Sequence, residues 1–349
     1  MWLDSSEKVH APEIGRRWIN SPNVTLREMQ GRVVLVDFWD YTCINCIRTL
    51  PYLKEWDRRY RAFGLTVIGV HTPEFHFAHT EEHVERAVRK FGIEYAVVLD
   101  NEYQAWQAYA NRCWPAKYLI DRKGYVRFYH FGEGSYRETE EAIQKLLLEI
   151  DPEAPLPLPM NPVREADEPG ARCLPVTPEL YLGFERGRLG NESGYASNKV
   201  SDYRAGLDYA AEVAYLDGPW FAGREAIEAC PLDGRPSHLL VSCAAAEVNL
   251  VMNAPESGEA ALSVLVDGAP LARSEAAEDV GWIEGRSIIR VNEPRMYRLI
   301  KAAEVRQRLV ELSVSAPGLE AYAFTFVSCV SGHTEKALSD VNSGAPATS

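Results

Sequence analysis

Nearly continuous apolar runs alternate with amphipathic stretches over the first part of the chain. Residues 33–39 and 65–70 are apolar with little alternation, as in strands that are buried on both faces of a sheet. Residues 44–62 and 80–91 repeat their apolar side chains at helical spacing. Pro51 lies inside the first of these helical stripes, where we expect a kink. The pattern predicts strand, helix, strand and helix in that order.

A third strand, a hairpin and a final helix complete this part of the chain. Residues 96–99 form a short apolar run, and residues 102–110 are predicted as a short helix. Residues 118–120 and 125–129 flank Asp-Arg-Lys-Gly, a sequence typical of a hairpin turn. Residues 139–150 are amphipathic and predict the last helix. Together these elements indicate a mixed α/β domain over residues 1–150.

The texture of the sequence changes after residue 150. Residues 151–172 contain six prolines and little periodicity, which predicts a stiff, extended linker. Short β-rich runs separated by turn clusters then predict an all-β sandwich, jelly-roll-like, over residues 173–330. The polar residues 331–349 are expected to form a flexible tail.

Composition and charge narrow the class of protein. The chain of 349 residues is 46% apolar and carries a net charge of −13. This acidic balance argues against a nucleic-acid-binding surface, which requires clustered Lys and Arg. No stretch approaches the roughly 20 apolar residues that cross a bilayer, and the acidic first residues are unlike a secretory signal. We therefore expect a cytoplasmic protein without a membrane span, or an extracytoplasmic one if a leading segment has been removed.

Two of the seven cysteines, Cys43 and Cys46, have the spacing of a redox pair. Cys43 follows a predicted strand and begins a predicted helix, where free amide groups favour the thiolate and are expected to lower the pKa. Cys46 lies one turn further and is expected to face inward and to keep its proton. The arrangement predicts that Cys43 attacks a substrate disulfide and that Cys46 resolves the mixed disulfide.

Half of a zinc site and two packing cysteines are the alternative interpretations of this pair. Zinc normally requires a second Cys or His pair, and none with suitable spacing follows. His79 and His83 are one helical turn apart, but no third ligand completes a set. The sequence therefore predicts neither a metal nor another cofactor.

Asp37 lies inside the apolar run before the pair. A carboxylate is costly to bury without a role, although it could instead point to a solvated strand edge. A buried thiol at Cys46 cannot attack until a base removes its proton. Asp37, with a pKa raised by burial, is the predicted base.

Several segments resemble thioredoxin-like proteins of the TlpA/ResA branch, and specifically the soluble C-terminal region of DipZ-type thiol-disulfide proteins. The resemblance rests on residues 25–53, on Val-Ile-Gly-Val-His-Thr-Pro-Glu-Phe, on Asp-Asn-Glu-Tyr-Gln-Ala-Trp, on Trp114-Pro115 and on His-Phe-Gly-Glu-Gly. It implies a thioredoxin fold followed by a carbohydrate-binding-module-like domain. Implied partners are protein thiol or disulfide substrates, an upstream electron donor and a possible glycan ligand. Candidate sugar-stacking side chains in the second domain, most of them expected in its core, are Tyr181, Phe184, Tyr195, Trp220, Trp282 and Tyr297.

The same resemblance assigns further site residues. Pro115 corresponds to the cis-proline that faces the cysteine pair and exposes the backbone of residue 114 to an incoming strand. Trp114 is expected to narrow the site or to stack on substrate, unless it packs in the core. Glu74 corresponds to a glutamate near the active site that shares proton transfer with Asp37, unless it is a solvated loop residue. Trp39 and Thr42, which lie just before the pair, are grouped with the substrate-binding residues.

The predicted function is thiol-disulfide exchange with protein substrates through Cys-Ile-Asn-Cys. A peroxiredoxin-like thiol peroxidase is the first alternative, but residues 36–43 lack the proline of the Pro-x-x-x-Thr-x-x-Cys loop that such an enzyme requires. A glycan- or protein-binding module with a vestigial redox site is the second.

Overall fold

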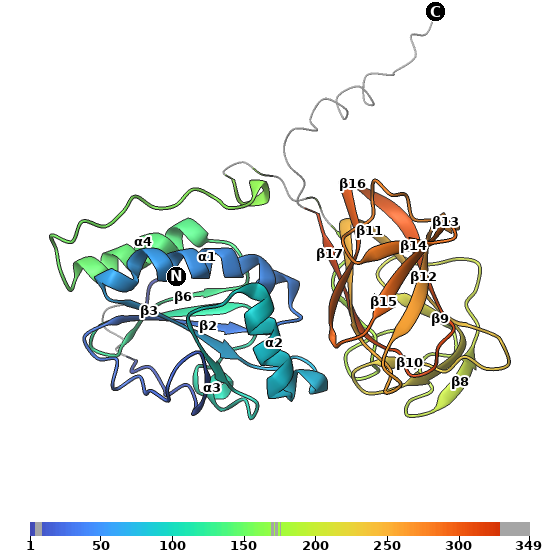
Figure 1. Cartoon of the computed structure of the whole chain (residues 1–349), viewed down its shortest axis with the longest axis horizontal. Helices are drawn as coiled ribbons and strands as arrows, with labels where there is room; N and C mark the ends of the chain where they lie inside the picture. Colours follow the sequence, from blue (N-terminus) through green and yellow to red (C-terminus); the bar gives the residue numbers. More distant parts are fainter. Residues whose placement is uncertain (4–8, 169–170, 172–173, 175, 329–349) are drawn as a thin grey trace, which may run out of the picture. The chain divides into compact units, whose positions relative to one another are not determined.

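The computed structural model describes residues 1–3, 9–168, 171, 174 and 176–328. The chain divides into two compact units between Val163 and Arg164. The first unit combines helices with a sheet, and the second is built of strands (Figure 1).

A six-stranded mixed sheet in the order β1-β4-β3-β2-β5-β6 forms the first unit. Its strands are β1 (Arg17–Ile19), β2 (Val33–Trp39), β3 (Leu65–His71), β4 (Ala96–Leu99), β5 (Ala116–Ile120) and β6 (Val126–Phe131). Strands β2, β3 and β4 are parallel to one another, whereas β5 is antiparallel to β2 and to β6. The predicted strands are confirmed. Only β1 is unexpected, because three residues carry too little pattern for a prediction.

The helices of this unit are α1 (Ile44–Tyr60), η1 (Arg61–Phe63), η2 (His76–His79), α2 (Glu81–Phe91), α3 (Gln104–Ala108) and α4 (Tyr136–Leu148). Helix α1 continues through Pro51. Helices α1 and α4 lie side by side on one face of the sheet, and α3 lies on the other (Figure 1). Because side chains alternate along a strand, Val36 and Phe38 enter the core with Ala105 of α3, and Asp37 points to the opposite face, which α1 covers.

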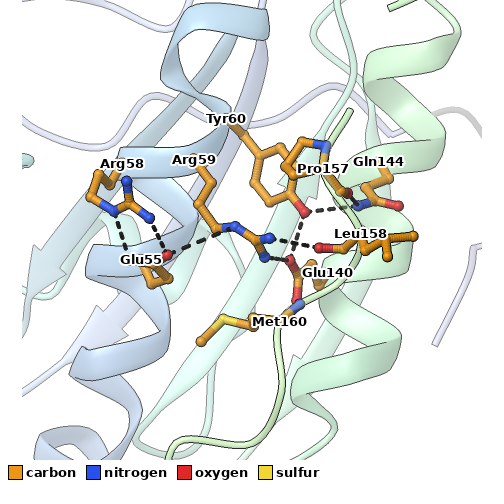
Figure 2. A network of polar contacts seen from close by, with 9 residues as sticks. All are labelled: Glu55, Arg58, Arg59, Tyr60, Glu140, Gln144, Pro157, Leu158 and Met160. Carbon is orange, nitrogen blue, oxygen red and sulfur yellow. Dashed lines mark hydrogen bonds and ion pairs between the residues drawn. The ribbon is translucent and has the colours of Figure 1, made fainter. Parts of the chain in front are cut away.

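The first half of the proline-rich segment belongs to the first unit. Residues 157–163, here called the strap, cross α1 and α4 (Figure 2). Gln144 Nε2 donates to the carbonyl of Pro157 at 2.8 Å, and Arg59 donates to the carbonyl of Leu158 at 2.6 Å. Met160 N donates to the buried carboxylate of Glu140 at 2.9 Å. The boundary between units therefore lies beyond residue 150, because the extended strap uses its free backbone groups to bind two helices.

An eleven-stranded sheet forms the second unit, and all its ladders are antiparallel. A short η3 (Glu165–Asp167) precedes it, and its strands are β7 (Leu180–Tyr181), β8 (Val200–Tyr203), β9 (Ala214–Ala222), β10 (Ile227–Ala229), β11 (Ser237–Asn253), β12 (Ala260–Val266), β13 (Ala269–Pro270), β14 (Val280–Ile283), β15 (Arg286–Val291), β16 (Arg295–Val314) and β17 (Glu320–Val327). The predicted all-β domain is confirmed. Strand β11 pairs with β9 along its first half and with β17 along its second, so the ladders β11-β17-β10-β9 close on themselves.

The second unit has its own core. Trp220 and Tyr297, two of the aromatic residues considered for sugar stacking, are completely buried in it. They cannot offer a ring to a ligand. Tyr181 is partly exposed and lies under the guanidinium of Arg186, 3.7 Å from its ring centre.

Residues 331–349, predicted as a tail, lie outside the described part of the chain. Within the described ranges, none of the helices has the length and apolar character needed to span a bilayer.

Candidate active site

Cys43 caps the N-terminus of α1. Its backbone is extended, and its Sγ accepts a hydrogen bond from the backbone N–H of Cys46 at 3.2 Å. Cys43 is partly exposed, whereas Cys46 is only 1% exposed. Both cysteines are free thiols in this structure. The thiol of Cys43 is therefore accessible from solvent, whereas that of Cys46 is buried next to it.

Burial raises the pKa of the Cys43 thiol, and the nearby carboxylates of Glu74 and Asp40 raise it further. The expectation that the helix end alone would lower this pKa is therefore wrong, because desolvation outweighs the hydrogen bonds that the sulfur accepts. Burial, followed by the contact with Cys43, also raises the pKa of Cys46 well above that of a free thiol. Cys46 therefore needs a base before it can attack.

Asp37 has the properties of such a base. It lies in the middle of β2 and is 1% exposed, and burial raises the pKa of its carboxyl group to about 7. Lys117 of β5 lies directly across the antiparallel ladder and is also buried. The positive charge of Lys117 lowers the pKa of Asp37 and so opposes the increase caused by burial. Burial in turn lowers the pKa of Lys117. Burial therefore favours the uncharged form of each group, and the attraction between them favours the charged forms.

Three buried polar atoms at and around Asp37, one of them its own carboxylate oxygen, have no hydrogen-bond partner among the described residues. They are Asp37 Oδ1, Trp39 Nε1 and the hydroxyl of Tyr95. Gly69 lies opposite Asp37 on β3, and a Cβ atom placed there would come within 2.9 Å of Trp39 Nε1. The missing side chain at Gly69 thus makes room for the indole in this polar pocket of the core.

A second buried acid, Asp40, holds the loop that leads into Cys43. Its Oδ1 accepts hydrogen bonds from Thr42 N at 2.7 Å and from Thr42 Oγ1 at 2.5 Å. Its Oδ2 accepts one from Glu74 N at 3.1 Å and lies 3.4 Å from His71 Nε2. Asp40 and His71 are both completely buried. This carboxylate therefore ties the loop after β2 to the loop after β3.

Pro115 forms a cis peptide bond with Trp114, as expected. Phe38 lies opposite Ala116, so Pro115 lies beside the end of β2, where the Cys43 loop begins. The partly exposed indole of Trp114 donates to the carbonyl of Thr72 at 3.0 Å and packs on Trp106, with ring centres 4.3 Å apart. Trp114 thus lines the rim made by the loop after β3.

Two predicted substrate-binding residues are corrected by the structure. Trp39 is completely buried and packs edge-on against His71. Thr42 is 1% exposed, and its hydroxyl is committed to Asp40. Neither side chain is exposed to a substrate, so both support the site through their contacts with His71 and Asp40. Glu74 is partly exposed and lies near enough to Cys43 to affect its pKa.

Lys117, Asp40 and His71 are site residues that the sequence did not predict. No local signal marks Lys117, since it becomes a partner of Asp37 only through the register of β2 and β5. Asp40 gave a signal, a carboxylate three residues before the attacking thiol. His71 gave no signal of its own, because it meets Asp40 only in the folded chain. The described residues hold no cluster of three or more His, Cys, Asp or Glu side chains arranged to bind a metal ion.

Two family models match the chain. Residues 9–129 match the AhpC/TSA family, and residues 177–326 match a thioredoxin-like C-terminal domain. The two matched segments fall in the two structural units.

Curated relatives include DipZ from Mycobacterium bovis and Mycobacterium tuberculosis, each 37% identical over 260 residues, which is 72% of this chain. The chain spans only about a third of these relatives, 35% of their length. The thiol-disulfide oxidoreductase ResA of Halalkalibacterium halodurans is 28% identical over 39% of this chain and 72% of its own. Among solved structures, a thiol-disulfide isomerase from Corynebacterium glutamicum is 26% identical over 39% of this chain and 96% of its own, with a TM-score of 0.36.

ResA, whose name states an activity, is a thiol-disulfide oxidoreductase. The chain is therefore a DipZ homologue that joins a thioredoxin-like domain of the AhpC/TSA type to a thioredoxin-like C-terminal domain.

Proposed function

We propose that this protein is a thiol-disulfide oxidoreductase that exchanges disulfides with protein substrates through Cys43 and Cys46. The observation that carries the proposal is the unequal exposure of the two thiols at one helix terminus. Cys43 is accessible and accepts a backbone N–H bond, which stabilises the thiolate. Cys46 is enclosed next to it and is suited to a second, intramolecular step.

The reaction proceeds in two exchanges. The Cys43 thiolate attacks one sulfur of a substrate disulfide, forms a mixed disulfide and releases the other substrate sulfur as a thiolate. Cys46 then loses its proton to the carboxylate of Asp37 and attacks Cys43 Sγ. The substrate leaves as a dithiol once its thiolates are protonated, and the Cys43–Cys46 pair becomes a disulfide. An upstream dithiol donor must reduce this disulfide before the next turnover.

The second step depends on the buried acid. A pKa of about 7 for Asp37 keeps a substantial fraction of the carboxylate available at neutral pH, yet makes it basic enough to accept a thiol proton. Glu74 lies on the exposed side of the pair and is the candidate for proton transfer with solvent.

Trapping of mixed disulfides tests the order of attack. The Cys46→Ser variant should accumulate mixed disulfides with a protein substrate, whereas Cys43→Ser should form none. Cys113→Ser is the matched control, because Cys113 is a partly buried thiol next to Trp114 and should leave reduction of insulin by dithiothreitol unchanged. Equal trapping by both single variants would reject the assigned roles, and an inactive wild-type protein would reject the function.

The AhpC/TSA match keeps a thiol peroxidase as the second candidate, because peroxidases share this fold. A peroxidase would consume hydrogen peroxide through Cys43 with dithiothreitol as reductant, and it would not catalyse insulin reduction. We expect the reverse, because Cys46 lies one helical turn from Cys43, where it can resolve a mixed disulfide.

The second unit is proposed as a binding or docking module. Its separate core supports this role, and a glycan is the ligand class that we propose to test first. Binding of the full chain to a glycan array, with Tyr181→Ala as the altered ring, would identify or exclude such a ligand.

A further inference from the structure

Asp40 and His71 form a buried acid–imidazole pair beneath the attacking thiol. His71 Nε2 lies 3.4 Å from Asp40 Oδ2, and neither residue exposes any surface. The ring of His71 is stacked by Tyr41 at 5.7 Å and is met edge-on by Trp39 at 5.3 Å. Neither ring nitrogen of His71 makes a hydrogen bond within the described residues. The carboxylate of Asp40 is therefore the group that a protonated His71 would face.

Asp40 is coupled to Cys43 through the loop that both belong to. Cys43 N donates to the carbonyl of Asp40 at 3.3 Å, and the hydrogen bonds to Thr42 fix the carboxylate in this loop. The negative charge of Asp40 raises the pKa of the Cys43 thiol. Burial would raise the pKa of Asp40 itself, but its contacts with His71 and Thr42 hold that pKa below its ordinary value. Asp40 thus keeps its charge, and among the described residues His71 is the basic side chain that lies against it.

The other charged and titratable groups around the pair do not replace His71. The backbone N–H of Glu74 donates a hydrogen bond to Asp40, and the carboxyl group of Glu74 adds to the negative charge near Cys43. Asp100, at the end of β4, accepts hydrogen bonds from Thr72 and from the first turn of α3. The surroundings of His71 are therefore acidic, and no other cation is in contact with Asp40 among the described residues.

We propose that His71 acts through Asp40 as a positioning residue for the attacking thiol: its charge state decides whether the carboxylate beside Cys43 is balanced, and so how readily Cys43 ionises. An imidazole is the side chain whose charge ordinarily changes between about pH 5 and 8. With His71 protonated, the pair is neutral and the thiolate of Cys43 forms more easily. With His71 neutral, the charge of Asp40 opposes the thiolate. This inference rests on the proposed role of Cys43 as the attacking thiol.

The test measures ionisation of Cys43 directly, without disulfide exchange. The reduced full chain is alkylated with iodoacetamide from pH 5 to 9, and the rate at Cys43 is followed by mass spectrometry. Asp40→Asn should raise this rate at pH 7, and His71→Gln should lower it, each by about threefold or more, as expected for a charge change near a thiol. The double variant should behave like Asp40→Asn, because no charge is left for His71 to balance. His83→Gln is the matched control, since its ring binds the carbonyl of Phe77, and should follow the wild type.

Opposite directions of the two single variants separate this role from a structural one, because damage to the loop would change both rates in the same direction. Rates that fall together, or that both stay within twofold of the wild type, would overturn the proposal. If His71→Gln does not fold, His71→Asn replaces it, with the same expected fall in the alkylation rate at pH 7. Insulin reduction by the wild type is assayed separately, so that failure of the proposed oxidoreductase function can be distinguished from failure of the proposed role of His71.

Discussion

Asp37 and Lys117 lie directly opposite each other on the antiparallel strands β2 and β5, and both side chains are buried. Both interact electrostatically with the thiol of Cys46. Burial favours the neutral form of each, while their mutual attraction favours the charged pair. The balance of these two effects determines the pH at which Asp37 can accept a proton.

The Asp37→Asn variant should slow the second exchange step and spare the first. An amide cannot accept the Cys46 proton, so the rate of resolution should fall by about a hundredfold at pH 8, the lower end of the usual contribution of a general base. Stopped-flow fluorescence with a small disulfide substrate separates formation of the mixed disulfide from its resolution.

The same experiment with Glu74→Gln tests whether this second acid contributes to proton transfer, since Glu74 lies on the partly exposed side of the pair. Resolution rates that are equal in wild type and Asp37→Asn from pH 6 to 8 would exclude the carboxyl group as the base. The double variant shows whether the two acids act together.

The Lys117→Met variant should shift the pH profile of resolution upward. The ammonium charge of Lys117 opposes the effect of burial on Asp37, so its removal should raise the pKa of that carboxyl above about 7. The midpoint of the resolution rate should move to higher pH by about one unit. Alkylation of Cys43 serves as the control and should change less. A midpoint that moves to lower pH would contradict the assigned sign.

Folding stability should fall as pH rises through the pKa of Asp37. The pKa of Asp37 is about 7 in the folded state and about 3.9 in the unfolded chain. The contribution of this group to the free energy of unfolding is therefore fully present below about pH 4 and is lost as the pH rises through 7. At about 1.4 kcal/mol per unit, the loss is at most about 4 kcal/mol. Asp37→Asn should remove this dependence and be more stable than the wild type at pH 8.5. Urea unfolding at pH 5 and 8.5 measures it, and parallel changes in both proteins would contradict it.

The reduction potential should lie near that of thioredoxin, about −270 mV, and well below the value of about −120 mV typical of DsbA. The pKa of Cys43 is raised by burial and by the Glu74 and Asp40 carboxylates, so the reduced form gains little from a stable thiolate. Equilibration with glutathione or with thioredoxin of known potential gives the value. A result close to that of DsbA would show that the thiolate is stabilised after all.

The strap should be necessary for stability of the first unit. Chains ending at Val163 and at Asp151 differ by the hydrogen bonds that Pro157, Leu158, Met160 and Val163 make to α1 and α4. At about 1 kcal/mol each, their loss should destabilise the shorter chain by about 2–4 kcal/mol. Thermal unfolding of the two chains checks this.

Reduction of a small disulfide substrate adds a functional control to the truncation. The chain ending at Val163 should work at nearly the full-length rate, because every residue assigned to the reaction precedes the strap. A rate at least tenfold lower, about 1.4 kcal/mol of barrier, would mean that the second unit completes the active site.

Local patterns in the sequence were enough to predict the elements of the first unit and the pair of thiols. Continuous apolar runs and helical stripes are local patterns, so β2, α1, β3, α2 and β4 could be read from them. The position of Cys43 at a strand-to-helix junction is equally local. The change to short β-rich runs was enough to predict an all-β second unit.

The side chains that surround the thiols and the end of the first unit depend on contacts between distant parts of the chain, which the sequence does not reveal. Lys117 meets Asp37, and His71 meets Asp40, through strand pairings between residues far apart in the chain. The composition of residues 151–172 is that of a linker, yet the strap forms hydrogen bonds with α1 and α4. No local pattern reveals these donors and acceptors on the two helices. Burial likewise reversed the expected pKa shift of Cys43, because desolvation depends on everything packed around the sulfur.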